Sequence, residues 1–257
     1  MPDSTHASPP GAAASAGGAE LGRNSRAGVT QQVLAGAIAC AFIMLFTLGW
    51  ELAARRGWVD PFFVSRPSAI AYQLFDWWHG GTSRGPLAVH VGVTLTEAAL
   101  GLMAGSLAGA LGGVAFRAGT LRGEVFQLFV WIFRPAPLVA LAAALALGAG
   151  FGMAASAAFA AVLVFFVAVA DARTHRPALA TLRRRCGLAL AGAVLGECFV
   201  ARSGVGWLIV RAVHQFNAGG VYAAFVVLTV VALCVDMLAR GGERWWLRAH
   251  VKAPVGR

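Results

Sequence analysis

Long runs of apolar residues, without the alternation typical of half-buried strands, dominate the chain after residue 30. A helix needs about 20 apolar residues to cross the hydrocarbon core of a bilayer, and runs of this length recur along the sequence. We therefore expect an all-α, polytopic membrane domain over residues 29–250. Its six predicted spans lie near residues 33–53, 91–116, 125–147, 152–170, 178–200 and 220–238.

The two ends of the chain have a different composition. Residues 1–28 are rich in Ala, Gly, Ser and Pro, which predicts a disordered tail that cannot bury a core. No apolar core follows a basic start at the distance of a signal peptide, so the first span should remain as a signal anchor. Residues 251–257 form a second short tail.

The fifth predicted span is unusual because its apolar run is short. From Gly187 to Val200 it has only 14 residues, and a full span requires a start near Ala178, directly after Pro177. Arg183, Arg184 and Arg185 then fall in the first turns of the helix. Their charged ends must reach the membrane interface or face protein.

Composition and charge agree with a membrane protein. Of the 257 residues, 58% are hydrophobic and only 12% are charged, about half the share in soluble domains. The net charge of +10 indicates topology rather than nucleic-acid binding, because no basic soluble domain accompanies it. With both ends on one side, that side holds 14 basic residues and the other holds six. This bias predicts that both termini are cytoplasmic.

Cysteines and histidines show no spacing typical of a metal site or a disulfide framework, and no catalytic constellation is evident. We expect no catalytic, cofactor-binding or metal-binding residues. The single lysine, Lys252, stands outside any phosphate-binding loop, so ATP chemistry would need a partner.

Charged residues inside the spans are candidates for a translocation path, because charge in a bilayer is costly. Glu97 and Glu197 lie near the predicted outer ends of the second and fifth spans. Arg134 lies deeper, beside Pro135 and Pro137, where irregular backbone is expected.

Small residues repeat every four positions in the second span. Gly101, Gly105, Gly109 and Gly113 form one smooth helix face, on which another backbone can approach closely. We expect this face to pack mainly within the chain, with a subunit interface as the alternative.

Four stretches carry a resemblance to a known family. They are WELAARRGWVDPFFVSRPSAI (50–70), HVGVTLTEAALGLMAGSLAGALGG (90–113), GAVLGECFVARSGVGWLI (192–209) and VDMLARGGERWWLRAH (235–250). The chain resembles the permease subunit of ATP-binding-cassette (ABC) importers of the nitrate, sulfonate and taurine family. The resemblance implies a type I importer fold in the inner membrane, with cytoplasmic ATPase subunits and an extracytoplasmic solute-binding protein. It also implies a homodimer, or a dimer with a second permease.

One feature of that family is missing. Its permeases carry a cytoplasmic helical loop with a Glu-Ala-Ala…Gly motif between the fourth and fifth spans, which docks in the ATPase. Here only residues 171–179 remain for the loop, and nine residues cannot hold two helices, since one helix averages about 11. The motif-like residues 97–101 lie inside the second span instead. The remaining candidates for an ATPase-facing loop are Asp171, Arg173, His175, Arg176 and Arg183.

Several functions remain open at this point. The chain is either a pore-forming importer subunit for a small, often anionic solute, or a degenerate paralogue or scaffold that pairs with an intact permease. An ion-coupled secondary transporter would require two inverted halves with broken helices, and no such repeat is visible. The gap in the loop is either natural or a gene-model error, and no residue selects the solute.

Overall fold

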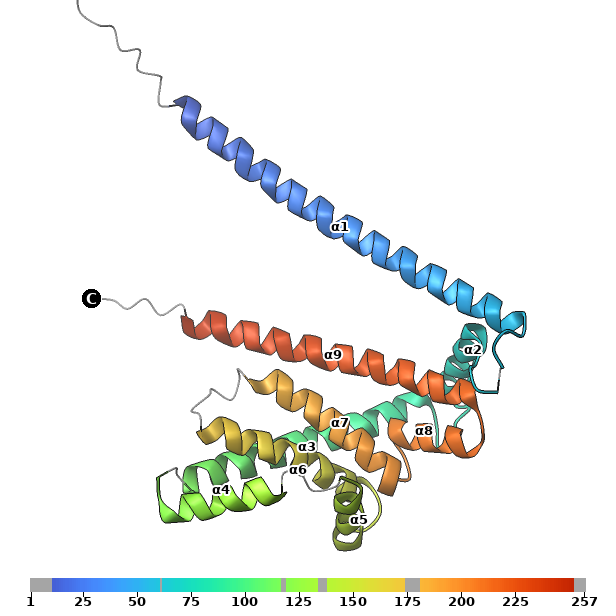
Figure 1. The fold of residues 1–257 in the computed structure, drawn as a ribbon, viewed down its shortest axis with the longest axis vertical. Helices are drawn as coiled ribbons and strands as arrows, with labels where there is room; N and C mark the ends of the chain where they lie inside the picture. Colours follow the sequence, from blue (N-terminus) through green and yellow to red (C-terminus); the bar gives the residue numbers. More distant parts are fainter. Residues whose placement is uncertain (1–10, 61, 117–118, 134–137, 174–180, 252–257) are drawn as a thin grey trace, which may run out of the picture. The chain divides into compact units, whose positions relative to one another are not determined.

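The computed structural model describes residues 11–60, 62–116, 119–133, 138–173 and 181–251. Every secondary-structure element that it assigns in this part of the chain is an α-helix, which is consistent with the expected helical membrane protein (Figure 1). The chain divides into two compact units, residues 1–58 and 59–257.

The first unit contains one long helix, α1 (Gly11–Arg55). Its apolar part, Leu34–Arg55, is long enough to cross a membrane, as the first predicted span requires. Near its end Arg55 Nε pairs with Glu51 Oε1 at 2.7 Å. The helix also covers residues 11–28, where the composition predicted a disordered tail. Alanine has the highest helix propensity and is frequent in this segment.

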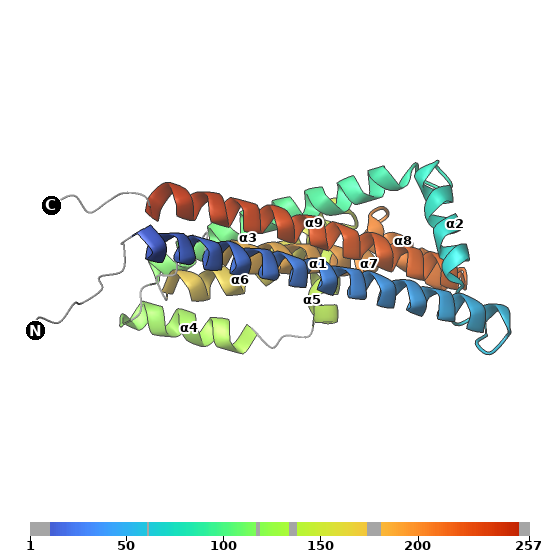
Figure 2. The same cartoon turned by 90° about the horizontal axis from the view of Figure 1, so that it is seen from above.

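The second unit holds the other eight helices that the structure describes. In chain order they are α2 (Pro67–Trp78), α3 (Leu87–Ala115), α4 (Leu121–Phe133), α5 (Leu138–Ala149), α6 (Met153–Arg173), α7 (Leu182–Val200), α8 (Val205–His214) and α9 (Ala218–Val251). The centre is made by α3, α6 and α7, each of which packs on the other two. Helix α9 packs on α2, α7 and α8 and runs along the bundle (Figure 2).

Contacts between glycines and alanines show the direction of the central helices. Going along α3, Gly101 faces Ala160 of α6 and Gly109 faces Ala168, so α3 and α6 run parallel. Along α7, Gly192 faces Ala160 and Gly196 faces Ser156, so α7 runs antiparallel to α6. Parallel helices that follow one another must be joined by a segment that returns across the bundle. Helices α4 and α5 lie in that segment.

The described residues give four or five candidate crossings, so the expected six remain a prediction. Among these residues, four helices can cross a membrane by length and composition: α1, α3, α6 and α9. Helices α7 and α8 are bent by 42° at their break and count as a fifth crossing if taken together. The predicted span 125–147 contains two described helices, α4 ending at Phe133 and α5 beginning at Leu138, and residues 134–137 lie outside the described residues. Proline disfavours the helical conformation of the residue before it, and both Pro135 and Pro137 stand in this interval.

Two helices lie in segments where only loops were predicted. Helix α8 follows α7 directly, and α2 begins with proline at its first position, a favoured place for it. Helix α2 buries Ile70 and Trp77, while Tyr72, Phe75 and Trp78 on its other side are exposed. Aromatic side chains of this kind are enriched at membrane–water interfaces.

Candidate functional site

The structure brings together two acidic residues that are a hundred positions apart in sequence. Glu97 on α3 and Glu197 on α7 are each only 1% exposed. Gly101, one turn after Glu97, packs on Ala157 and Ala160 of α6, and Gly196, next to Glu197, packs on Ser156, so the two acids lie close together beside one turn of α6. Glu97 is ten residues into α3, about 15 Å along the helix from its start. The third residue proposed for a translocation path, Arg134, lies outside the described residues.

The two acids belong to a group that holds the start of α8. The backbone N–H groups of three successive residues point at buried side chains of α3 and α7. Gly204 N–H donates to His90 Nδ1 (3.2 Å), Val205 N–H to Thr94 Oγ1 (2.9 Å) and Gly206 N–H to Glu197 Oε2 (2.6 Å). The first N–H groups of a helix have no partner inside the helix. We call His90, Thr94, Glu97, Glu197 and residues 204–206 the polar cluster.

His90 has a defined tautomer in this cluster. Its Nδ1 accepts the Gly204 N–H and therefore carries no proton, so Nε2 carries it and donates to Thr82 Oγ1 (3.0 Å). The Thr82 hydroxyl in turn donates to the Gly85 carbonyl. The imidazole is thus neutral, and this chain of bonds ties α3 to the loop before it and to α8.

The glycines at the start of α8 permit this close approach. Gly204 has φ +107°, a region that side chains disfavour, and a Cβ there would overlap the Glu197 carboxyl. A Cβ at Gly206 would lie 2.9 Å from Glu197 Cβ. The glycines of GECFVARSGVG (residues 196–206), part of one stretch that carries the family resemblance, therefore have a packing explanation in this chain.

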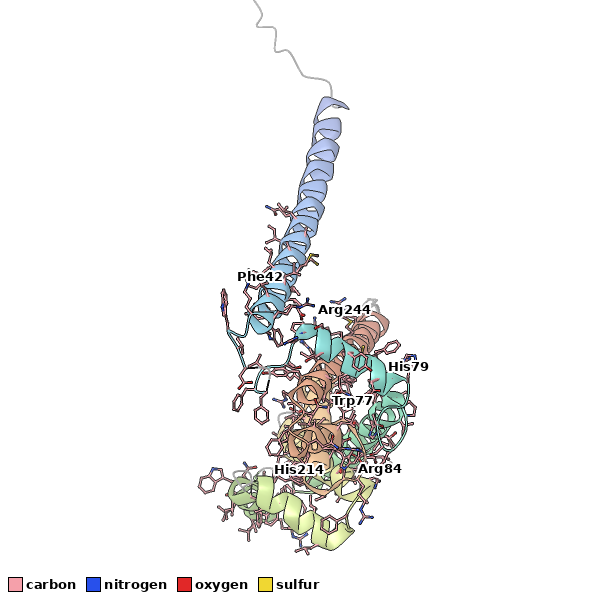
Figure 3. The ribbon with its side chains drawn as sticks, turned by 90° about the vertical axis from the view of Figure 1, so that its right-hand side faces the viewer. Phe42, Trp77, His79, Arg84, His214 and Arg244 are labelled. Carbon is pink, nitrogen blue, oxygen red and sulfur yellow. The ribbon has the colours of Figure 1, made fainter. Side chains whose placement is uncertain are left out.

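Two arginines lie near the polar cluster, at the end of the unit where α2 and α8 meet. The Trp207 ring stacks on His90 with a centroid distance of 5.6 Å, and the guanidinium groups of Arg84 and Arg211 lie 5.6 and 5.3 Å from the Trp207 centroid. Figure 3 looks onto this end, with Arg84 and His214 labelled. Within the described part of the chain, neither arginine forms an ion pair with a carboxylate.

A small polar cavity of about 90 Å³ lies beside Arg211. Gln73 of α2 and Asn217 line the cavity, and Asn217 Nδ2 donates to Gln73 Oε1 (2.9 Å). Its size suits one or a few water molecules. It connects α2, α8 and the start of α9 through polar contacts.

At the opposite end of the bundle, the arginines of the predicted ATPase-facing segment make ion pairs within the chain. Asp171 at the end of α6 is 2% exposed and accepts hydrogen bonds from Arg184 Nη2 (2.7 Å) and from Arg185 Nη2 (3.0 Å). Arg183 pairs with Asp236 of α9, which also binds Arg240 (2.6 Å). The pairs join α6, α7 and α9.

These contacts change the interpretation of the proposed ATPase-facing residues. Asp171 and Arg183 face partners in their own chain rather than a free surface. His175 and Arg176 lie outside the described residues, as does the side chain of Arg173. Arg184 and Arg185, which were expected to reach the membrane interface or face protein, are the direct partners of Asp171. Asp236 of α9, which the sequence analysis did not name, is the partner of Arg183.

The glycine face of α3 is buried against α6. A Cβ at Gly101, Gly109 or Gly113 would overlap the side chain of Ala160, Ala168 or Ala172, respectively, and one at Gly105 would overlap the Ala161 carbonyl oxygen.

In the described residues no group of three His, Cys, Asp or Glu side chains could hold a metal ion.

Comparison with known proteins adds one relationship to this geometry. No family model and no solved structure matches the chain. A probable ABC transporter permease protein of Haemophilus influenzae is 26% identical over 218 aligned positions, which cover 72% of this chain and 86% of the relative. The similarity supports an ABC transporter permease in general.

Proposed function

We propose that this chain is a permease subunit of an ATP-driven importer in the inner membrane, and that it pairs with a second, intact permease. The permease relative, the helical membrane architecture and the resemblance of residues 50–70, 90–113, 192–209 and 235–250 support the first part. The parallel course of α3 and α6 supports a return crossing through α4 and α5, and so six crossings in all.

The short connection between α6 and α7 carries the second part of the proposal. Helix α6 ends at Arg173 and α7 begins at Leu182, which leaves residues 174–181 for the connection. A standard interface needs about 800 Å² from each partner, more than eight residues readily supply. The flanking charges of Asp171 and Arg183 are already paired within the chain.

The alignment with the relative agrees with a missing segment. It extends over 218 positions, whereas 72% of the 257 residues is about 185, so this chain has gaps at about 33 aligned positions. The ion pairs of Asp171 with Arg184 and Arg185 hold the end of α6 against the start of α7, and a short connection fits this arrangement.

The transported solute is proposed from charge and resemblance together. Arg84 and Arg211 lie on the predicted outer side, without carboxylate partners among the described residues. Their charge suits a small anion, the class that the family resemblance implies. A solute-binding protein would deliver it.

The coupling test is co-purification of the tagged chain with the ATPase encoded beside it. We expect weak binding and no stimulation of ATP turnover by the solute-binding protein, because the docking element is absent. An intact permease from the same operon should bind the ATPase well. As a matched variant, residues 174–181 are replaced by the corresponding loop of that permease, which should restore binding. A stable complex with stimulated turnover by the unmodified chain would refute the proposed dependence on a second permease.

The proposed topology has its own test. Reporters fused after residue 86 and at the C-terminus should lie on opposite sides of the membrane, with the C-terminus cytoplasmic, because 14 of the 20 basic residues other than Arg134 fall on or next to one side. An alkaline phosphatase fusion is active outside and a fluorescent protein fusion inside. Both reporters on the same side would exclude six crossings with cytoplasmic ends.

A further inference from the structure

The carboxyl pair of the polar cluster is short of hydrogen-bond donors. Glu197 Oε2 receives the Gly206 N–H, but Glu197 Oε1 and both oxygens of Glu97 are buried with no donor in the part of the chain that the structure describes. Two hydroxyls lie nearby: Thr94 donates to the His90 carbonyl (3.1 Å), and Ser156, which lies beside Glu97, donates to the Gly152 carbonyl (3.4 Å).

No cation in the described structure neutralises the pair either. On α3 the nearest titratable group is His90, which is neutral because its Nδ1 accepts a hydrogen bond. On α7 it is the thiol of Cys198, and α6 contributes the hydroxyl of Ser156. Arg84 and Arg211 face Trp207 rather than the carboxyl groups. Helix α5 has no ionisable residue.

Two adjacent carboxylates that are both ionised would repel each other in this setting, and each would lack solvation. Like charges at such close range cannot both persist, and a shared proton is the usual solution. The two acids are not equivalent, because only Glu197 meets the N-terminus of α8. The positive end of a helix dipole stabilises negative charge there. The negative charge therefore belongs on Glu197 and the proton on Glu97.

We propose that Glu97 and Glu197 form a proton-binding site inside the membrane, in which Glu97 is protonated at neutral pH and donates to Glu197 Oε1. The pair then carries one negative charge, held by the N-terminus of α8, and it connects α3, α7 and α8. Removing the proton places two charges between α3 and α7 and weakens this connection. The folded protein thus retains a proton that the unfolded chain releases, so its stability declines as the pH rises.

Infrared spectroscopy of the purified full chain in lipid nanodiscs detects the proton directly. At neutral pH the wild type should show the C=O band of a protonated carboxylic acid, shielded from rapid hydrogen–deuterium exchange. Glu97→Gln should abolish this band, and the control Glu124→Gln, which removes an exposed carboxyl, should leave it. Absence of the band in the wild type, or its persistence in Glu97→Gln, would overturn the proposal.

Thermal unfolding provides an independent measurement. The Gln side chain replaces the donor that a protonated Glu97 supplies, so Glu97→Gln should unfold within about 2 °C of wild type at neutral pH, and Glu97→Ala at least about 4 °C lower. Between neutral and alkaline pH the wild type should lose stability while Glu97→Gln does not. Equal losses for Gln and Ala at neutral pH would contradict the proton.

A bound metal cation would also neutralise the pair, and the same proteins distinguish it from a proton. Unfolding temperatures are measured with sodium, potassium or calcium chloride against choline chloride at constant ionic strength. A proton predicts no difference between these salts. Stabilisation of the wild type by one cation, absent in Glu97→Gln, would replace the proton with that ion.

Discussion

Replacing Asp171 with asparagine is expected to destabilise the protein by about 3 kcal/mol or more, because it leaves Arg185 buried without its anion. The Asp171 and Arg185 side chains are only 3% and 7% exposed, and two guanidinium nitrogens of Arg185 donate to the same carboxylate oxygen at 3.0 and 3.1 Å. An uncompensated charge at this depth must draw in water or move. The destabilisation is measured as the difference in unfolding free energy between wild type and Asp171→Asn, by denaturant titration or thermal scanning.

The exposed ion pair at the same end of the bundle is the matched control. Asp236 binds Arg183 and Arg240, but the side chains of both arginines are about half exposed, so Asp236→Asn should change stability much less. The double variant Asp171→Leu with Arg185→Leu should be more stable than either single variant, since apolar residues can replace a buried pair. Equal effects of Asp171→Asn and Asp236→Asn would show that Asp171 is not buried as described.

The hydrophobic pattern was sufficient for the helical class but not for every span. Runs such as 33–53 and 152–170 are continuous and correspond to helices long enough to cross a membrane. The run 125–147 is equally continuous, yet the structure describes two helices in it, one ending at Phe133 and one beginning at Leu138. A hydropathy window counts apolar side chains and gives Pro135 and Pro137 little weight. The backbone hydrogen bonds that prolines cannot make are invisible to it.

The candidate site could be predicted only in part, for a different reason. Charge inside an apolar run identified Glu97 and Glu197 one by one, but their meeting depends on the packing of α3 against α7. The partners of Arg184 and Arg183 likewise lie 13 and 53 residues away. His90 was recorded only as a histidine without ligand spacing. Its position one helical turn before Thr94, with Glu97 a further three residues on, was the available signal that all three share one helix face.

The start of α8 shows why such a motif is hard to interpret without coordinates. Gly204 and Gly206 stand in the stretch 192–209 that carries the family resemblance, but their role depends on the residues that contact them. Three side chains from two other helices satisfy the first N–H groups of α8. A sequence shows a cap only when the capping residue directly precedes its helix, as Ser or Asp commonly does. A cap supplied from more than a hundred residues away, as by His90 and Thr94, leaves no local trace.

Replacing Gly105 with leucine is expected to destabilise the bundle by about 3 kcal/mol or more and to reduce the yield of folded protein in detergent. A Cβ at this position would overlap the Ala161 carbonyl oxygen of α6 and lie 2.8 Å from Val164 Cβ. The first of these is backbone, so relief requires α3 and α6 to separate. That separation would also loosen the packing around Gly101 and Gly109, because the glycine face is continuous. Size-exclusion chromatography and thermal unfolding measure the effect.

Gly92 on the same helix is the matched control for this change. It is exposed and a Cβ there meets no atom within 4 Å, so Gly92→Leu removes a glycine from a helix interior without creating an overlap. Its stability should equal or exceed that of the wild type, because leucine is the better helix former. The difference between the two variants isolates close packing from helix propensity. If Gly105→Leu were folded and as stable as Gly92→Leu, α3 and α6 would not be in backbone contact, and the parallel arrangement from which six crossings are argued would lose its support.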